Sequence, residues 1–391
     1  MLKSTYITFS SILLTFNDRD YLIKGMIPAK DKMPQEDAVG RFAKAMHIVY
    51  GNFDGVPEDD AENWMPPSDP GAGGHRGRYL WTDAFGLVNF ITLHEKTARP
   101  KYAILGKRLV QTVHDVLGRT RDGSARLPGA TDEEPLKGGL RIGKMDEGGS
   151  DGDGQYHHYL TLWMFALNRL SWAAKDHLYN DMAIQLAKAI HPHFVFQPSH
   201  RPRMVWKIST DMKKVLVPSG GHLDAAAGFA VYRMLQETAA KQGRRDQLLK
   251  QEIADYERVM SRKSSMSPSD DPLDLGMGLW ICHFYHNEEW AADFTEEALA
   301  LANQIFGGTS SEMCGRASQR LAFREFGACL GVQCFGGEED LNSAAEAVVE
   351  FWEKNMEQDG EDDLRPISQV MYAAALMPGA FRKGFISGSE A

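Results

Sequence analysis

Apolar residues recur with the period of an α-helix through most of the chain from residue 36 onward, and clusters of Gly, Pro and Asp separate the periodic segments. Few segments alternate between apolar and polar residues, the pattern that indicates strands. One that does so is residues 203–219, RMVWKISTDMKKVLVPS, which predicts a short β-hairpin. The pattern therefore predicts an all-α protein with one small hairpin.

The predicted helices are of two kinds that alternate along the chain. One kind is rich in aromatic and small residues and nearly free of Lys, as expected of a helix buried on most sides; its segments are 82–93, 156–170, 222–235, 272–285, 318–335 and 367–377. The other kind is amphipathic with a charged face; its segments are 36–50, 101–116, 177–191, 247–262, 289–305 and 340–355. Six buried helices alternating with six half-exposed ones predict two concentric rings, an (α/α)6 toroid. An open α-solenoid is the alternative.

Four of the buried helices share a local pattern, an acid followed within four residues by Gly. The acids are Asp83, Asp224, Asp274 and Glu325, and the last three are spaced by 50 and 51 residues, which suits a repeat of helical hairpins. Gly inside a helix costs about 1 kcal/mol relative to Ala. Its recurrence therefore predicts that the inner helices pack closely around a narrow axis.

Length and composition favour one large globular domain. The chain has 391 residues, of which 43% are apolar and 25% charged. We expect an N-terminal extension over 1–34, a single toroid domain over 35–381 and a C-terminal tail over 382–391. The net charge of -10, without a dense basic run, argues against nucleic acid as a partner.

Nothing in the sequence predicts a membrane protein. No window approaches the roughly 20 continuous apolar residues that a membrane span needs. The short apolar patch near the N-terminus is interrupted by Ser and Thr, and a charged stretch follows where a signal-peptide cleavage site would stand. The four cysteines lack CxxC spacing and are expected to be reduced thiols. These features predict a cytoplasmic protein.

Two motifs at the openings of inner helices carry a family resemblance. YLWTDAFG (79–86) and GGHLDAAAGF (220–229), together with the alternation of helices, resemble the six-hairpin glycosidase superfamily over residues 35–381. That superfamily includes glucanases, unsaturated glucuronyl hydrolases and, on the same toroid, sugar epimerases and polysaccharide lyases. WKISTDMKKVLVPSGGHLD (206–224) also looks like the signature of a group of uncharacterised bacterial and fungal six-hairpin proteins. The resemblance implies a site in a cup formed by the loops that enter the inner helices.

Cleavage of a glycosidic bond typically needs one carboxylic acid and one carboxylate. Asp83 and Asp224 are predicted in first turns, where the helix dipole favours the ionised form, so they suit a base or nucleophile; equally, each could only cap its helix. Asp274 follows a proline and is better explained as an acid that complements the helix dipole.

Glu325 is the predicted general acid. If its helix begins near Ser318, Glu325 lies about two turns in among apolar neighbours, which would raise its pKa. A salt bridge to Arg320 or Arg324 is the competing explanation and would make it structural.

Further side chains near the predicted cup are candidates for binding substrate. Aromatic rings such as Trp206 can stack on a sugar, and arginines can hold an acidic one. The long glycine-rich loop 120–154 is expected to cover the cup as a lid. The predicted substrate-binding residues are Trp81, Asp153, Gln155, Tyr156, His157, His158, Trp206, His222, Arg76 and Arg141.

No metal site or cofactor is predicted. Asp151 and Asp153 would fill the first and third positions of an EF-hand loop, but Gly154 comes early and Leu162 replaces the bidentate Glu. Adjacent histidines on a helix point about 100° apart. His157 and His158 therefore cannot share a face, and only one of them is expected to face the cup.

Together these features predict a carbohydrate-active enzyme, a glycoside hydrolase that acts on a sugar or a uronic-acid-containing glycan and takes an oligosaccharide as its partner. A sugar epimerase or polysaccharide lyase would instead use one of the two histidines, with Tyr156, for proton abstraction. A non-catalytic helical toroid that binds a ligand is the third interpretation.

Overall fold

The computed structural model describes residues 35–148, 151–196, 202–244, 247–261, 266–307, 316–336, 339–356 and 364–387. Its contacts divide the chain into two units, Met1–Pro34 and Gln35–Ala391. The predicted N-terminal extension lies outside the described residues. Every helix and strand given below belongs to the second unit.

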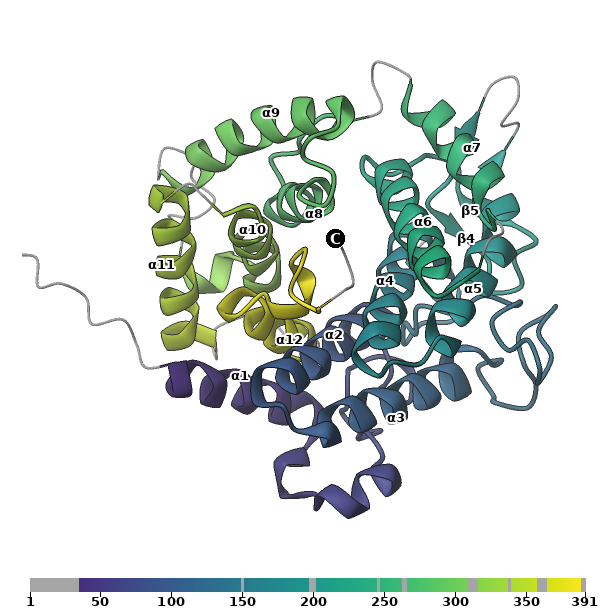
Figure 1. The fold of residues 1–391 in the computed structure, drawn as a ribbon, viewed down its shortest axis with the longest axis horizontal. Helices are drawn as coiled ribbons and strands as arrows, with labels where there is room; N and C mark the ends of the chain where they lie inside the picture. The colour runs from purple at the N-terminus through teal and green to yellow at the C-terminus, as the bar shows by residue number, and fades with distance from the viewer. Residues whose placement is uncertain are drawn as a thin grey trace, which may run out of the picture. The chain divides into compact units, whose positions relative to one another are not determined.

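Twelve α-helices within the described residues form two rings (Figure 1). The inner helices are α2 (Leu80–Thr97), α4 (His157–Ala173), α6 (Asp224–Lys241), α8 (Pro272–Cys282), α10 (Ala322–Phe335) and α12 (Arg365–Leu376). The outer helices are α1 (Gln35–Tyr50), α3 (Pro100–Leu117), α5 (Leu178–Phe194), α7 (Lys250–Met260), α9 (Glu289–Phe306) and α11 (Glu339–Asn355). Each inner helix packs against the next, and α12 packs against α2, which closes the ring. The predicted (α/α)6 toroid is confirmed.

The two kinds of helix differ in burial as their sequences require. In α2 every residue from Leu80 to Leu93 is buried, whereas α3 buries one face and exposes the other. Short 3₁₀ helices within the described ranges lie at Phe53–Gly55, Glu58–Asn63, His75–Gly77, Ala317–Gln319 and Gly379–Phe381. No helix in the described ranges is long and apolar enough to cross a bilayer.

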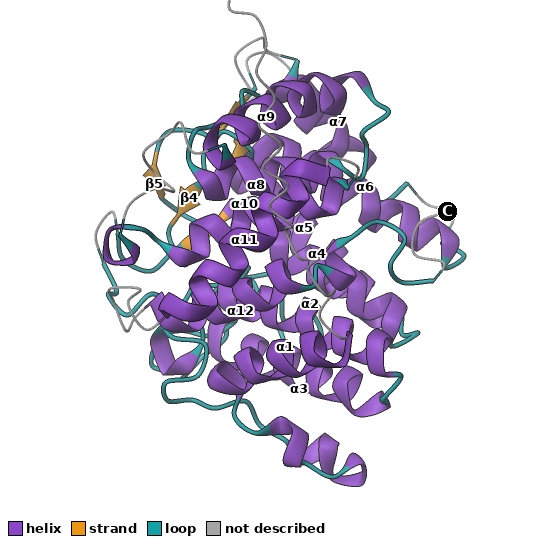
Figure 2. Ribbon diagram, turned by 90° about the vertical axis from the view of Figure 1, so that its left-hand side faces the viewer, coloured by secondary structure: helices purple, strands orange, loops and turns teal. Residues whose placement is uncertain are grey.

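In the part of the chain that the structure describes, five short strands lie at one side of the helices (Figure 2). β1 (Gln155–Tyr156), β4 (Lys207–Ile208) and β5 (Val215–Val217) form an antiparallel sheet in the order β1-β4-β5, and β2 (Val195–Phe196) pairs with β3 (Arg203–Met204). The predicted hairpin is confirmed for β4 and β5. The start of the predicted segment pairs with β2 instead.

The glycines of α8 and α10 let two inner helices approach with backbones in contact. A Cβ atom at Gly276 would lie 1.9 Å from the Gly327 carbonyl oxygen, and one at Gly331 would lie 2.2 Å from the Gly276 carbonyl oxygen. The prediction of close packing between inner helices is confirmed for this pair.

Glycines of α2, α6 and α8 have another role, because each makes room for an aromatic ring from an outer helix. A Cβ atom would lie 2.0 to 2.4 Å from the ring or hydroxyl in each pair, which are Gly86 with Tyr50, Gly228 with Tyr256 and Gly278 with Phe294. Here glycine serves the contact between the rings of helices, which the sequence did not predict.

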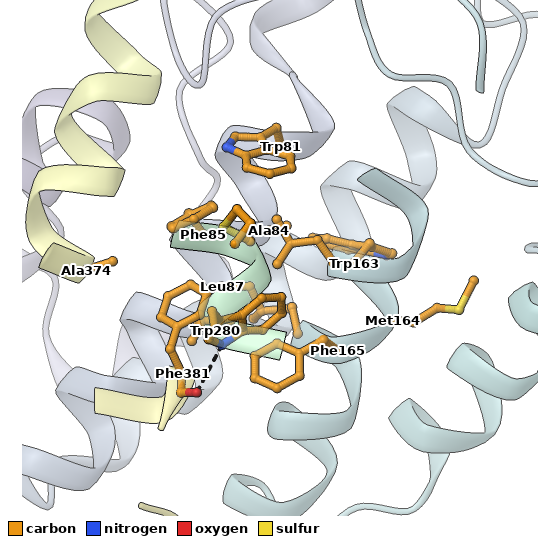
Figure 3. Packing of buried hydrophobic residues seen from close by; sticks show 14 of the residues in the cluster. Trp81, Ala84, Phe85, Leu87, Trp163, Met164, Phe165, Trp280, Ala374 and Phe381 are labelled. Carbon is orange, nitrogen blue, oxygen red and sulfur yellow. Dashed lines mark hydrogen bonds between the residues drawn. The ribbon is translucent and has the colours of Figure 1, made fainter. Parts of the chain in front are cut away.

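A cluster of aromatic side chains closes the centre of the toroid (Figure 3). The ring centroids of Phe165 and Trp280 lie 4.8 Å apart, and Phe381 lies 5.9 Å from Trp280. Phe381 belongs to the C-terminal 3₁₀ turn. Trp280 Nε1 of α8 donates a 3.1 Å hydrogen bond to the Phe381 carbonyl, and the Ala380 amide donates one of 2.9 Å to Thr92 Oγ1 of α2. The C-terminal turn thus seals the toroid from below.

Candidate active site

All six inner helices contribute to one cavity of about 380 Å³. The segment around Trp206 and the loop before α6 complete its mouth. The lining residues are Trp81, Tyr156, His158, Tyr159, Thr161, Leu162, Trp206, Gly221, His222, Leu223, Asp224, Ala227, Val231, Leu273, Asp274, Met277, Trp280, Ile281, Phe323 and Ile367.

Asp224 is the first residue of α6, and its carboxylate is almost fully buried at the cavity wall. The Gly221 amide donates to its Oδ2 at 3.1 Å. The Nδ1 atoms of His158 and His157 lie 3.5 and 3.6 Å from its Oδ1. Burial alone would raise the pKa of Asp224, but the interactions with the two histidines outweigh burial and lower it below its ordinary value. These contacts favour the ionised form of Asp224.

His157 and His158 point in different directions, as adjacent residues on a helix must. His158 lines the cavity, and its side chain is 39% exposed. His157 is fully buried behind Asp224, where its Nε2 lies 2.7 Å from the hydroxyl of Tyr256 on α7. His158 is thus the histidine that faces the cavity, and His157 links Asp224 to the outer ring.

Asp274 is the second carboxyl of the cavity. It lies in the first turn of α8, which Asp271 caps by accepting from the amides of Leu273 and Asp274. Its side chain reaches solvent, but partial desolvation by the cavity wall raises its pKa; Asp224 adds to this increase, and His158 and His222 oppose it. The cavity therefore holds two carboxyls whose pKa values are shifted in opposite directions.

Aromatic rings form one side of the mouth. The rings of Tyr156 and Trp206 lie 4.9 Å apart, edge to face, and Tyr156 also lies 5.1 Å from Tyr159. Lys207 Nζ lies 4.9 Å from the centre of the Tyr156 ring and holds it from behind. Trp81 packs against Tyr159 at 5.1 Å. The structure thus brings together three predicted aromatic residues, Trp81, Tyr156 and Trp206.

Asp83 lies outside the cavity. Its Oδ1 accepts from Arg78 Nη1 at 2.9 Å and from the Tyr50 hydroxyl at 3.0 Å, and it has no exposed surface. Burial raises its pKa to about 6, although Arg78 and Tyr50 act in the opposite direction. Its place in the first turn is as predicted. Its carboxylate, however, joins α1, the preceding loop and α2, so the geometry does not support a catalytic role.

Glu325 also lies outside the cavity. The prediction that it lies two turns into its helix is wrong, because the chain is extended at Arg320 and Leu321 and α10 begins only at Ala322. Arg320 Nε donates to its Oε1 at 2.7 Å, and Trp352 Nε1 donates to its Oε2 at 2.8 Å. The alternative explanation, a salt bridge to Arg320, is confirmed, so Glu325 forms a buried ion pair that joins α10 to the segment before it.

The predicted lid does not reach the cavity, whose lining includes none of the described residues of loop 120–154. Asp153 is buried within the loop, where Arg121 Nη1 lies 2.8 Å from its Oδ2 and Arg141 donates to the same atom. The Gly143 amide donates to its Oδ1. These contacts fold the loop on itself, so Asp153 and Arg141 lie away from the cavity.

Gln155 and Arg76 are likewise placed elsewhere. Gln155 is buried, and its amide bonds to Leu140, Gly138 and Thr210. Arg76 is exposed beside Gly123, where a Cβ atom would lie 2.5 Å from its Nη1. Of the predicted substrate-binding residues, the cavity therefore contains Trp81, Tyr156, His158, Trp206 and His222.

The described residues contain no group of three or more His, Cys, Asp or Glu side chains arranged to hold a metal ion. From the sequence, Asp274 was explained as an acid that complements the helix dipole, and Tyr256 was not predicted as a site residue. The signal that could have identified Asp274 was its 50-residue spacing from Asp224, since this spacing places both acids at the same level of successive inner helices. Tyr256 gave no such signal, because it lies on an outer helix.

Comparison with known proteins identifies the fold. No protein-family profile matches the sequence, and no curated protein matches it. The structure is similar to that of a glycoside hydrolase family 76 alpha-mannanase from Bacteroides thetaiotaomicron, with a TM-score of 0.54 and 9% identity over 87% of this chain and 95% of that chain. A family 76 mannosidase from the same species gives a TM-score of 0.48 and 11% identity over 88% of this chain and 98% of that one.

Proposed function

We propose that this protein is a glycoside hydrolase whose active site is the cavity between the inner helices. The observation that carries the proposal is the pair of carboxyls, Asp224 with a lowered pKa and Asp274 with a raised pKa, that line the same cavity. Glycoside hydrolysis needs one carboxyl that donates a proton and one that acts ionised, and shifts in opposite directions favour this division of roles.

In the proposed mechanism Asp274 donates its proton to the glycosidic oxygen as the bond to the anomeric carbon breaks. Asp224 acts on the other side of the sugar, either as the nucleophile or as the base that takes a proton from water. The net reaction adds one water across the bond. The rings of Tyr156 and Trp206 offer a stacking surface for the sugar at the mouth.

The fold supports a carbohydrate substrate without selecting one. The structural neighbour with a TM-score of 0.54 is named as an alpha-mannanase, so α-mannosides are the first substrates to test. Neutral glucosides and glycosides of uronic acids follow from the wider six-hairpin resemblance. Membership of that superfamily, and of its uncharacterised bacterial and fungal group, is part of the proposal.

The test is hydrolysis of a panel of α- and β-linked mannosides, glucosides and glucuronides, including unsaturated uronic oligosaccharides, with products identified by mass. Asp224→Asn and Asp274→Asn should each lower kcat/KM by at least about 100-fold, since general acid–base groups contribute that much. The unfolding temperature should change little for Asp274→Asn, because its side chain reaches solvent.

Asp83→Asn and Glu325→Gln are the matched controls. Both remove a carboxylate outside the cavity. They should therefore lower the unfolding temperature and leave kcat/KM of the folded protein nearly unchanged. If instead they abolish turnover at a temperature where they remain folded while Asp274→Asn does not, the proposed acid is wrong. If no glycoside yields a product that has gained water, the hydrolase proposal is wrong.

A sugar epimerase or lyase is the second candidate, and the position of His158 favours it. His158 lines the cavity with the Asp224 carboxylate 3.5 Å from its Nδ1, an arrangement that supports a histidine as a general base. His158→Ala would then abolish turnover. The product of an epimerase would have the mass of the substrate, and a lyase would give a product with a new double bond formed by elimination. His157 is not the residue to test, because it is buried behind Asp224.

A further inference from the structure

The cavity has a polar mouth and an apolar lower half. His158, Asp224 and Asp274 lie in the first turns of α4, α6 and α8, and His222 precedes α6. Further along the same helices the lining changes to Leu162, Val231 and Ile281. Val231 and Ile281 each follow a cavity acid by seven residues, or about 10 Å along a helix. The apolar lining at Val231 and Ile281 thus lies about two turns below the carboxyls.

Polar side-chain atoms of the other lining residues, from the mouth to the floor, are already bonded within the protein. Thr161 Oγ1 donates to the His158 carbonyl, and Trp81 Nε1 donates to Met371 Sδ. The hydroxyl of Tyr159 bonds to that of Tyr79, and Trp280 Nε1 donates to the Phe381 carbonyl. Below its mouth the cavity therefore offers a ligand mainly carbon surface.

From this division we infer the substrate class: a glycoside whose aglycone, the group attached to the anomeric oxygen, is a hydrocarbon chain or a similar apolar group. This inference rests on the proposed function. The sugar binds at the mouth, where His158, His222 and the two carboxyls can bond its hydroxyls. The aglycone enters the lower half and contacts Val231, Met277 and Ile281.

The opposite orientation is disfavoured by solvation. A sugar in the lower half would leave its hydroxyls without partners and lose their bonds to water. A hydrocarbon there gains roughly fourfold in affinity for each methylene removed from water. Because the Phe165, Trp280 and Phe381 cluster closes the floor, this gain must end at a finite chain length.

The test compares methyl, butyl and octyl glycosides of each sugar in the panel, using the full chain. Lengthening methyl to octyl should raise kcat/KM on the order of 100-fold, as burial of a few methylenes predicts. Most of the gain should appear as a lower KM, because the aglycone is bound equally before and during reaction. Equal kcat/KM across the series would overturn the inference.

A blocking variant tests the location. Ala227 lines the cavity one turn below Asp224, so Ala227→Phe should fill the lower half. It should bring the ratio of kcat/KM for octyl and methyl glycosides close to one. Ala292→Phe on the exposed face of α9 is the matched control and should keep the preference. A preference that survives in folded Ala227→Phe protein would place the aglycone elsewhere and overturn the assignment.

The two proposals fail differently. If methyl and octyl glycosides are hydrolysed equally well, the hydrolase proposal stands and the aglycone inference falls. If no glycoside is hydrolysed, the hydrolase proposal falls. Titration of octyl and methyl glycosides, monitored by tryptophan fluorescence, then decides whether the apolar lower half binds a hydrocarbon chain. Tighter binding of the octyl compound that Ala227→Phe abolishes supports the apolar half, whereas equal affinities overturn it.

Discussion

Asp83 and Asp224 both lie in the first turn of an inner helix, yet their surroundings shift their pKa in opposite directions. At Asp83 the cost of burial outweighs one arginine and one tyrosine. At Asp224 two histidines outweigh burial. The dipole of the helix is common to both, so the difference comes from side chains contributed by other segments.

The raised pKa of Asp83 makes a prediction about stability. Its pKa rises from 3.8 to about 6, so the folded protein holds this proton more tightly than the unfolded chain does. The contribution is complete below 3.8 and is lost as the pH rises through about 6. Asp83→Asn removes a group that titrates, so the unfolding temperature of the wild type relative to this variant should fall across that window.

Thermal unfolding of both proteins at several pH values measures this difference, and other titrating groups largely cancel because the two chains share them. Parallel curves would show that Asp83 titrates normally in the folded state. A difference that grows in favour of the wild type with rising pH would show that the Arg78 ion pair dominates over burial.

The site was less predictable than the fold, because side chains from other helices decide what each carboxylate does. Sequence reasoning selected Asp83 and Glu325 by their places in helices, but Tyr50 and Trp352, from outer helices, help to hold their carboxylates. Asp224 was selected for the same reason and does line the cavity. The arginines that pair with Asp83 and Glu325 lie only five residues before them, but the donors Tyr50 and Trp352 lie 33 and 27 residues away, so local sequence does not show that these two carboxylates are fully bonded.

Among the elements, helices were predicted to within a few residues because their periodicity is local. The error that affects the site is in the helix that contains Glu325. Its predicted start near Ser318 missed the extended residues that precede α10. The apolar run continues across this break, so the pattern alone could not locate it.

The contact between α8 and α10 gives a prediction at this scale. Gly276→Ala would place a Cβ atom against the Gly327 carbonyl, and backbone atoms cannot move aside as a flexible side chain can. We expect a loss of about 3 kcal/mol in the free energy of unfolding, near the upper end of overpacking costs. Urea denaturation measures it.

Gly40→Ala in α1 is the control, since no atom lies within 4 Å of its added Cβ. It should stabilise the protein by up to about 1 kcal/mol through helix propensity. If Gly276→Ala behaves like this control, the two helices do not approach as closely as described.

For the whole molecule, alternation of helix types predicted two rings but not how they close. Closure depends on contacts between the two ends of the domain, such as the bond from Asn89 Nδ2 to the Val370 carbonyl of 2.9 Å. The aromatic floor also depends on residues far apart in the sequence, because Phe381 contacts residues of α2, α4 and α8. Periodicity carries no information on such pairings.

The floor supplies a prediction for the whole toroid. Phe381→Ala would remove a fully buried ring and leave a hole below Trp280, with an expected loss of about 3 to 5 kcal/mol in the free energy of unfolding. Phe385→Ala, four residues further along and only partly buried, should lose less. Chemical denaturation of both variants measures the difference; equal losses would mean that Phe381 does not seal the centre.

The sealing of the toroid by its last turn also has a consequence for synthesis. Asp274 is made 107 residues before Phe381 (381 minus 274). At about 5 to 20 residues per second, the ribosome needs roughly 5 to 20 seconds to cover that distance. During this time the nascent chain contains both cavity carboxyls, while α12 and the floor are still missing. The cavity is therefore complete only after α12 and the C-terminal turn have left the ribosome.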